Sequence, residues 1–442
     1  MYRLIILTFF MMAVGGVKAQ TAWQSLDSLT YRLYEDKEWR PLLKEAHGSF
    51  RDGIDFYYLR VRAGIAAYEL KNYRLAVSHL SKAYQWNSSD EFVQFWYYMS
   101  LVMSGRSDEA KIMASGFSED FIQRYQISPV RGVNSVGAES QMTINTDYDG
   151  LLDESIAEAD SYVGYRNVLR RQLYTGITLD HEVKPRFYAF HGVSHLEIQR
   201  MQMIQTPSRN VSLHEESRTS QNQYYLQGRY YGGKGWNLYS SVNLIWGHAS
   251  SNWVSYTSAG IPVMNDYRYS ISDRLWNFGI ARELRFFRPK VSLTTANIND
   301  YTQTQVNGQL VLYPFGNTHF YTVTDVALHR DQSTEQTKTV WNQKVGLKTG
   351  PLWWIAEATS GDMKNFSVSD GYVVYNQPET ITGLYGMTAY IPLFKYRLNL
   401  TARYQVLNKE GMIFDYSSST VYAIKNYSFT DNNFLISLKW NL

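Results

Sequence analysis

The chain of 442 residues contains no cysteine and only 10 prolines. The absence of cysteine excludes disulfide scaffolds, thiolate metal sites, cysteine nucleophiles and a lipidated N-terminal cysteine. Positive and negative charges nearly balance, with a formal net charge of +3, so electrostatics gives no general reason to bind nucleic acid. We therefore expect neither a disulfide-stabilised domain nor a nucleic-acid-binding protein.

Long apolar runs are also missing after the first twenty residues. No later stretch approaches the roughly eighteen apolar residues that a transmembrane helix requires. The mean hydropathy is −0.36, yet the chain has 36 tyrosines, 20 phenylalanines and 12 tryptophans. This combination is typical of proteins in which membrane-facing apolar residues alternate with polar ones.

The first nineteen residues have the pattern of a secretory signal peptide. Arg3 gives a positive start, Leu4 to Val17 is almost wholly apolar, and Val17–Lys18–Ala19 offers a small-x-small cleavage site. About 14 apolar residues are too few to span a bilayer, so a membrane helix is disfavoured, and a buried N-terminal helix is the remaining alternative. We expect residues 1–19 to be removed on export.

Residues 20–125 predict a helical domain with an internal repeat. Small and apolar residues mark a helix–turn–helix with its turn near 71–73, and the pattern around Ala76 recurs at Ala110. The interval between these two alanines matches the period of the tetratricopeptide repeat, which the segment resembles. The residues expected to pack within the repeat are Gly64, Ala76, Leu80, Ala83 and Ala110. A generic helical bundle is the alternative.

The repeat has departures and one degenerate copy. Tyr98 stands where the tetratricopeptide family expects a small residue, and Ser88 replaces the usual proline. An earlier unit is expected around Trp39–Leu42–Leu43. The resemblance implies a concave face that docks a partner, and we expect that partner to be a periplasmic protein.

From about Val133 the hydrophobic period changes from 3.6 to 2, which indicates β-strands. The clearest alternating segments are Tyr396–Val406 and Phe434–Leu442. A soluble sandwich would alternate in the same way, but strands such as Trp236–Ser250 and Leu275–Phe287 are longer than globular strands. Aromatic residues also gather near the expected strand ends, which suits the girdles of a membrane barrel.

The expected connections are short at one end and long at the other, as in outer-membrane barrels. Long polar loops are expected at Thr206–Ser220 and Ser251–Asp266. The tight turns are expected at Lys184–Pro185, 232–235, Arg288–Pro289–Lys290, 314–317, Gly350–Pro351 and 392–394.

Six turns with both chain ends on one side give about fourteen strands. Twelve and sixteen are alternatives, because 369–382 and 412–433 could each contain further structure. The predicted fold is therefore α+β and multi-domain: helices at 20–125, then an antiparallel transmembrane β-barrel at 126–442. We expect it in the outer membrane of a Gram-negative bacterium, in contact with lipid, with the helices in the periplasm.

Three short motifs carry a family resemblance. Thr146–Asp147–Tyr148–Asp149 at the expected opening of the barrel, Tyr165–Arg166–Asn167, and the hairpin from Pro185 to His195 resemble the YaiO-like outer-membrane barrel proteins. The order of parts is also similar to polysaccharide-export porins, which implies a periplasmic platform below a pore and a polysaccharide as one cargo. The C-terminal strand resembles the barrel-assembly signal but ends in Leu442 rather than phenylalanine.

Charged and histidine residues on the expected inward faces are candidates for the lumen lining. On the strand 186–205, Tyr188 and Ile198 are assigned to lipid, so His191 and His195 face inward. Four residues along a strand span about 13 Å, too far for one metal ion. The predicted lining residues are His191, His195, Glu197, Glu283, Arg285, Asp325, Lys344, Arg397 and Arg403.

One group of residues suggests a catalytic alternative. His248 and Ser250 lie near the outer end of a strand, and the expected pairing brings Asn222 close to His248. This resembles the outer-membrane phospholipase arrangement, with Ser250 as nucleophile, His248 as base and Asn222 as the residue that orients it. No Gly-x-Ser-x-Gly, His-Glu-x-x-His or phosphate-binding loop is present.

The leading hypothesis is a non-enzymatic conduit or envelope assembly component without metal or cofactor, and a membrane-embedded lipid hydrolase is the second.

Overall fold

A computed structural model describes residues 23–127, 132–207, 211–257, 262–332, 336–418 and 420–442. The predicted signal peptide lies outside these residues. The described chain forms a helical unit and a barrel unit, and each is presented by itself. The last helix of the helical unit ends at Tyr125, and the first strand of the barrel unit begins at Val133.

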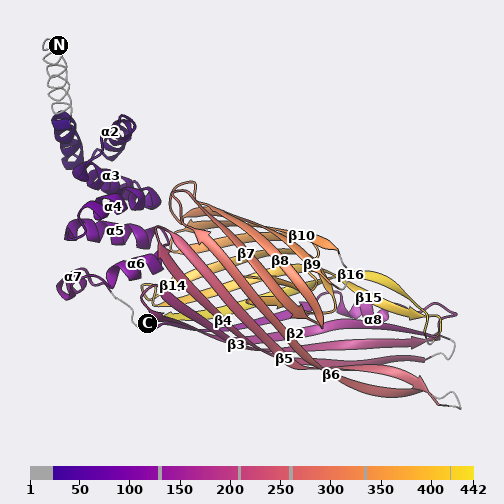
Figure 1. Cartoon of the computed structure of the whole chain (residues 1–442). Coiled ribbons are helices and arrows are strands. Elements are labelled where there is room, and N and C mark those ends of the chain that lie inside the picture. Colours follow the sequence, from indigo (N-terminus) through magenta and orange to yellow (C-terminus); the bar gives the residue numbers. More distant parts are fainter. Residues whose placement is uncertain (1–22, 128–131, 208–210, 258–261, 333–335, 419) are drawn as a thin grey trace, which may run out of the picture. The chain divides into compact units, whose positions relative to one another are not determined.

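The helical unit repeats at a constant interval along the chain (Figure 1). After the helical residues 23–35 come α2 (Trp39–Arg51), α3 (Tyr57–Glu69), α4 (Tyr73–Trp86), α5 (Glu91–Met103), α6 (Ser107–Ala114) and α7 (Glu119–Tyr125). The second helices of three successive pairs begin at Trp39, Tyr73 and Ser107, so the expected earlier unit around Trp39 is a full helix pair. None of the described helices combines the length and apolar character needed to cross a membrane.

The predicted packing positions lie inside this unit. Ala76, Leu80 and Ala83 are fully buried, and Ala110 is 1% exposed. Gly64 in α3 is needed because a Cβ there would lie 2.5 Å from Cγ of Leu80 in α4. These contacts explain why small residues recur at the helix–helix interfaces.

The third helix pair exchanges large and small residues between the same two positions. Tyr98 and Ala114 stand one repeat after Gly64 and Leu80, and Tyr98 packs against a cluster that contains Ala114 and Phe121. In the second pair the first helix carries the small residue and the second helix the large one, whereas in the third pair α5 carries the large residue and α6 the small one. The small Ala114 leaves room for the large Tyr98.

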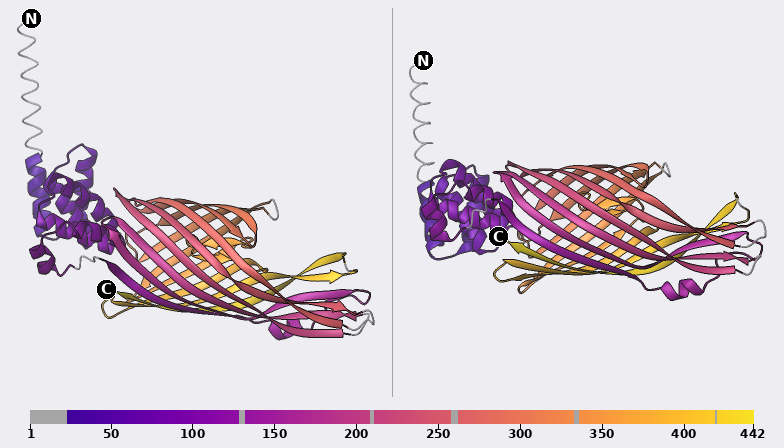
Figure 2. Two further views of the ribbon diagram at one scale, coloured as in Figure 1. Left: turned by 60° about the horizontal axis from the view of Figure 1, so that its bottom comes forward. Right: turned by 90° about the horizontal axis from the view of Figure 1, so that it is seen from below.

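The second unit is a closed antiparallel barrel of fourteen strands, as predicted (Figures 1 and 2). The chain-order neighbours pair, and β1 closes the barrel against β16. The barrel strands are β1 (Val133–Asn145), β2 (Val163–Lys184), β3 (Phe187–Thr206), β4 (Val211–Gly233), β5 (Trp236–Tyr256), β6 (Pro262–Arg282), β7 (Phe287–Ile298), β8 (Tyr301–Leu312), β9 (Phe320–Asp331), β10 (Thr337–Thr349), β11 (Leu352–Ser360), β14 (Thr380–Leu393), β15 (Leu398–Tyr416) and β16 (Tyr422–Asn441).

Six short connections lie at one end of the barrel, here named the turn end, with the start of β1 and the end of β16. The opposite end is named the loop end. One predicted turn is misplaced: Arg288–Pro289–Lys290 lies within β7, and the connection there is 283–286. Proline is tolerated at this point because it lies near the start of a strand.

Two predicted loops and one predicted opening are also wrong. Thr206–Ser220 and Ser251–Asp266 fall largely in the extended ends of β3 to β6, which pair in regular register as far as Thr206↔Val211 and Tyr256↔Pro262. Both segments are rich in polar residues, so the sequence predicted loops there instead of strands. Thr146–Asp149 lies after β1, in the connection that contains the helix α8 (Tyr148–Asp153), rather than at the opening of the barrel.

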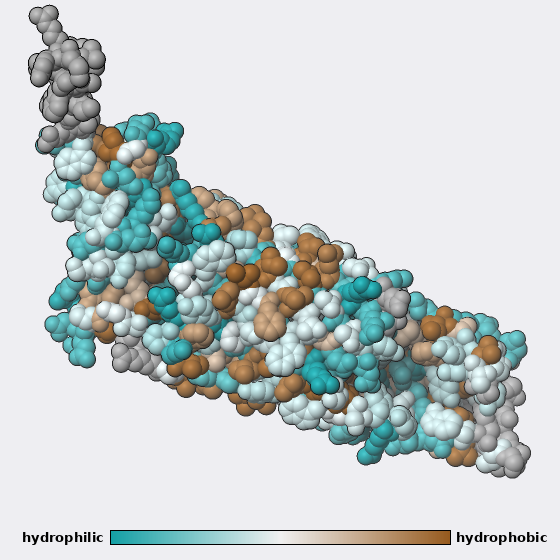
Figure 3. Space-filling view, viewed as in Figure 1, coloured by the Kyte–Doolittle hydropathy of each residue, from teal (hydrophilic) through white to brown (hydrophobic). Residues whose placement is uncertain are grey.

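The outer wall of the barrel carries a belt of exposed apolar side chains. On β5, Leu238, Leu244 and Trp246 point outward, while Asn237, Ser241 and Asn243 are buried inside. The outward set includes Val136, Met142, Ile177, Trp276, Phe278, Leu293, Val306, Leu328, Leu347, Met387, Phe434 and Ile436. Figure 3 shows apolar residues gathered over the middle of the barrel wall on one face.

Candidate functional site: the barrel lumen

A hairpin between β11 and β14 enters the lumen. Residues 361–379 contain β12 (Phe366–Val368) and β13 (Val373–Tyr375), which pair with each other and with no barrel strand. Ser369, Asp370 and Gly371 form the tip with φ angles of 55°, 58° and 84°. Gly371 has the left-handed φ that favours glycine, and a Cβ there would lie 2.3 Å from Cδ2 of Leu275.

The hairpin spans the lumen, because its residues bond to side chains on many strands around the wall. Its partners lie on β1 to β10 and β15. A loop that bridges so many strands is a structural element of the lumen rather than a surface connection.

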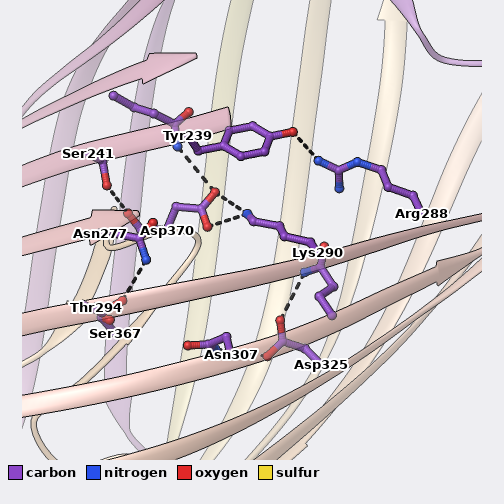
Figure 4. A network of polar contacts seen from close by, with 12 residues as sticks. Tyr239, Ser241, Asn277, Arg288, Lys290, Thr294, Asn307, Asp325, Ser367 and Asp370 are labelled. Atoms are coloured by element: carbon purple, nitrogen blue, oxygen red, sulfur yellow. Dashed lines mark hydrogen bonds and ion pairs between the residues drawn. The ribbon is translucent and has the colours of Figure 1, made fainter. Parts of the chain in front are cut away.

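At the tip, Asp370 is the centre of a polar network (Figure 4). Nζ of Lys290 lies 2.6 Å from Oδ2 of Asp370, and both side chains are largely buried. Ser241 donates to the backbone oxygen of Asp370 at 2.6 Å, and Asn243 donates to that of Gly371 at 2.7 Å. These bonds satisfy the backbone of a turn that is buried away from water.

At its C-terminal stem, the hairpin is held by buried charges. Nε of Arg200 lies 3.0 Å from Oε1 of Glu379, with the two side chains 8% and 4% exposed. Nearby, Nζ of Lys409 lies 2.7 Å from Oδ2 of Asp431. Buried charges require such partners, so this part of the stem is fixed more firmly than an ordinary loop.

Apolar side chains of the hairpin pack against the wall. Met363 and Phe366 join a buried cluster with Ala327, Val340, Ile381, Leu384 and Leu407. On β10 and β15, Val340 and Leu407 lie closer to the loop end than Lys344 and Arg403. Six residues of this cluster, all but Ala327, also line the cavity described next, so its lining is apolar toward the loop end.

A cavity of about 230 Å³ lies beside the hairpin and has a mixed polar and apolar lining. Its polar lining includes Gln141, Thr143, Gln172, Asn307, Gln309, Asp325, Asn342, Lys344, Glu357, Thr359, Gln377, Glu379, Arg403, Gln405, Lys409 and Asn433. A second cavity of about 170 Å³ shares Asn307, Gln309 and Asp325 with it. The lumen thus keeps space for water and small solutes beside the hairpin.

Of the nine predicted lining residues, Asp325, Lys344 and Arg403 face this cavity. Glu283, Arg285 and Arg397 lie instead in connections at the turn end, because β6 ends at Arg282 and β15 begins at Leu398. These residues alternate with apolar neighbours, which predicted that they lie on strands. In the structure the strands do not reach them.

The predicted phase of β3 is reversed. Val193 is 56% exposed, while Tyr188 and Ile198 are 1% and 3% exposed, so His191, His195 and Glu197 lie on the outer face. The reason is the hairpin, which gives inward apolar residues a protein partner: the ring of Phe190 lies 5.8 Å from that of Tyr372. A lumen filled with protein does not require polar side chains.

His191 and His195 form separate contacts on the outer face. Nδ1 of His191 lies 2.9 Å from the Tyr224 hydroxyl, and Nδ1 of His195 lies 3.0 Å from Oδ1 of Asn222. Among the described residues, no group of three or more histidines and carboxylates is placed to hold a metal ion.

The structure does not place the side chains of Ser250, His248 and Asn222 as the hydrolase hypothesis requires. Asn222 pairs with Trp246 as expected, but its side chain contacts His195 instead of His248. The Ser250 hydroxyl accepts a bond from the backbone nitrogen of Arg218 at 3.0 Å. In the described part of the chain no hydrogen bond joins His248 to Ser250, so this geometry gives no support to the hydrolase hypothesis.

Known proteins give little further information. No family model and no curated protein match the sequence. The chain is similar to the toluene transporter TodX of Pseudomonas putida (8% identity, TM-score 0.45, 71% of this chain and 91% of that chain). It is also similar to a FadL homologue of Pseudomonas aeruginosa (6%, 0.46, 70% and 90%) and a bacterial polysaccharide outer membrane secretin (9%, 0.35, 70% and 99%). Likeness at this level says nothing of cargo, and the fold assignment rests on the strand pairing itself.

Proposed function

We propose that the protein is an outer-membrane β-barrel that conducts small solutes and whose lumen is restricted by the hairpin 361–379. The observation that carries this proposal is the hairpin itself, which crosses a lumen that still contains polar cavities beside it. A barrel that served only as a scaffold would not need a hairpin in its lumen with cavities beside it.

The outer wall supports the membrane location. A spanning segment must pair its backbone donors and acceptors internally, and the closed ladder of fourteen strands leaves no strand without a neighbour on each side. The belt that includes Leu244, Trp246 and Ile436 is exposed on the outside, where hydrocarbon would cover it. The predicted signal peptide at 1–19 agrees with export.

A small solute is a better cargo than a polymer. The cavity beside the hairpin is about 230 Å³, and a polysaccharide chain could pass only after the whole hairpin had left the lumen. The buried stem pair Arg200–Glu379 opposes so large a movement.

We also propose that the tetratricopeptide-like helices dock a protein partner in the periplasm. Three helix pairs at a constant interval along the chain support this reading. Tyr31, Tyr58, Trp86 and Phe92 are exposed on the helical unit, and aromatic residues are enriched in protein interfaces.

The conduit is tested by the swelling of proteoliposomes in isosmotic glutamine. We expect Lys290→Met to speed swelling several-fold over wild type, because an unpaired buried Asp370 costs about 3–5 kcal/mol and loosens the tip. Lys395→Met, at an exposed turn-end position, serves as the control and should match wild type.

The proposal is wrong if wild-type and Lys290→Met vesicles both swell no faster than protein-free vesicles. Folding of each variant is checked by its altered gel migration on heating, so that an unfolded barrel is not mistaken for a closed one.

A further inference from the structure

Three arginines lie in one row across β2 to β6, the strands that extend beyond β7 to β11 at the loop end (Figure 2). Arg171 on β2 pairs with Gln199 on β3, and Gln199 pairs with Arg218 on β4. The backbone nitrogen of Arg218 donates to the Ser250 hydroxyl on β5 at 3.0 Å, and Ser250 pairs with Arg268 on β6. These five residues, here named the arginine row, alternate arginine with an uncharged polar residue.

The arginine row lies on the outer face of the barrel. Gln199 follows the outward Val193 on β3 at an even interval, so the two side chains share one face of the strand. The side chains of Arg218 and Arg268 are 70% and 76% exposed, and Arg171 is exposed as well. The guanidinium groups therefore contact whatever surrounds the barrel at this height.

The height of the row places it at the border of the membrane. Exposed aromatic side chains at the turn end, such as Phe187, Trp236 and Phe287, mark where the apolar belt begins. In chain order, the three arginines stand 13, 15 and 14 residues before the turn-end limits of β2, β4 and β6. At about 3.3 Å per residue and a tilt of about 35–45°, these intervals correspond to heights of roughly 30–40 Å. The apolar band of such a barrel is about 25 Å tall, so the row lies beyond it, at the level of the lipid headgroups.

A cavity of about 240 Å³ lies on the outer face between two of the arginines. Arg218, Arg268, Ser220 and Ser250 belong to its lining, and the serine hydroxyls can donate to an anion. Among the described residues that line this cavity, Glu197 is the one carboxylate. Two guanidinium groups against one carboxylate leave the lining with a net positive charge.

The carboxylates next to the row lie on its loop-end side. Glu216 contacts Arg170 at 3.2 Å and Arg218 at 3.3 Å, and Asp266 contacts Arg268 at 3.6 Å. Glu216 and Asp266 are 50% and 56% exposed. Exposed ion pairs of this kind contribute little to stability, whereas arginine and phosphate can form two parallel charged hydrogen bonds. A phosphate group on the membrane side can therefore replace these contacts.

The spacing of the row suits two phosphate groups. Neighbouring strands lie about 4.8 Å apart, so consecutive arginines of the row are separated by about 10 Å. A phosphate at Gln199 lies between Arg171 and Arg218, and a phosphate at Ser250 lies between Arg218 and Arg268. Nε of Arg171 donates to Oε1 of Gln199 at 2.8 Å, and no carboxylate pairs with Arg171 in the described chain.

We propose that the arginine row binds the headgroup of a membrane lipid that carries two phosphate groups, one between each two consecutive arginines. The acyl chains of this lipid lie along exposed apolar side chains nearer the turn end, among them Leu173 and Trp246. This continuous apolar surface favours a lipid over a free anion. The inference rests on the proposed membrane location and is independent of conduction.

Native mass spectrometry of the full chain in detergent tests this assignment with three matched lipids. Bisphosphorylated lipid A carries two phosphates, monophosphoryl lipid A one, and fully dephosphorylated lipid A none. We expect wild type to bind the first more tightly than the last by on the order of tenfold, as loss of a charged hydrogen bond predicts, with the second between them. Excess inorganic phosphate should not displace the bisphosphorylated lipid, because it has no acyl chains.

The variants should change the order of preference, which a general loss of folding cannot do. Arg218→Gln should abolish the preference for phosphorylated lipid, because Arg218 borders both phosphate positions. Arg268→Gln should remove only the advantage of two phosphates over one. Arg330→Gln, at an exposed position on β9, is the matched control and should keep the wild-type order.

Equal binding of the three lipids by wild type, or an unchanged order in Arg218→Gln, would overturn the proposal. Displacement of the lipid by inorganic phosphate would also overturn it, since the row would then bind a free anion. Because binding is measured without a membrane, a failure here is distinct from a failure of conduction. A protein that conducts current and shows no preference among the lipids would keep the conduit and lose the lipid site.

Discussion

At the scale of single residues, Gly64 makes the sharpest prediction in the helical unit. Gly64→Ala places a Cβ 2.5 Å from Cγ of Leu80, and overpacking of this kind costs about 1–3 kcal/mol. Gly48→Ala is the matched control, because Gly48 also lies within a helix but has nothing within 4 Å of its Cβ position.

Thermal unfolding of the full chain, followed by far-ultraviolet circular dichroism, should show a lower midpoint for the helices in Gly64→Ala. Gly48→Ala should be unchanged or up to about 1 kcal/mol more stable, since alanine favours the helix. Equal effects of the two substitutions would mean that the close contact with Leu80 does not exist.

His79 predicts the pH dependence of the same unit. Burial, with the nearby Arg60 guanidinium, lowers the pKa of His79 to about 3. Burial also lowers the pKa of His47, whose ring lies 5.5 Å from that of His79. In the unfolded chain these histidines take up protons near pH 6.5. Their contribution to the free energy of unfolding is therefore complete above that pH and is lost as the pH falls from 6.5 toward 3.

Urea unfolding between pH 7.5 and 5 should therefore show stability of the helices falling by up to about 1 kcal/mol per pH unit below 6.5. His79→Gln keeps an acceptor for Arg60 but cannot titrate, so its slope should be smaller. A wild-type stability that is flat across this range would show that His79 titrates normally.

At the scale of elements, the two faces of a strand make opposite predictions. Leu310 points outward from β8 and Gln309 points into the cavity. Leu310→Arg should lower the free energy of unfolding in lipid vesicles by about 2–4 kcal/mol, the cost of a cation in hydrocarbon. Gln309→Arg should cost much less, because water and Asp325 face the new charge.

Urea titration with tryptophan fluorescence measures both variants in the same vesicles. If Gln309→Arg proves as costly as Leu310→Arg, the assignment of the two faces is incorrect.

Element by element, the sequence predicted what local periodicity controls. The regular spacing of small residues predicted the helix pairs, and strict alternation predicted the faces of β5, β15 and β16. The predicted faces of β3 are wrong, because its apolar residues point inward, where Phe190 lies against Tyr372 of the hairpin. The alternation shows which face of a strand is apolar. It does not show whether that face contacts the hydrocarbon of a membrane or protein inside the lumen.

At the scale of the whole molecule, the candidate site could be predicted only in part. Asp325, Lys344 and Arg403 were identified as lining residues, since they lie on regular strands. The sequence does not predict the hairpin, although it leaves open that 369–382 contains further structure. Its contacts with β1 to β10 depend on closure of the barrel, which no local pattern encodes.

The central claim is that the barrel spans lipid and that the hairpin restricts its lumen. Single-channel current across a planar bilayer tests it most directly, comparing wild type with a variant in which 362–378 is replaced by a Gly-Ser linker. We predict brief or very small currents for wild type and large, steady steps for the variant. A folded variant that passes no more current than wild type at any voltage would contradict the account.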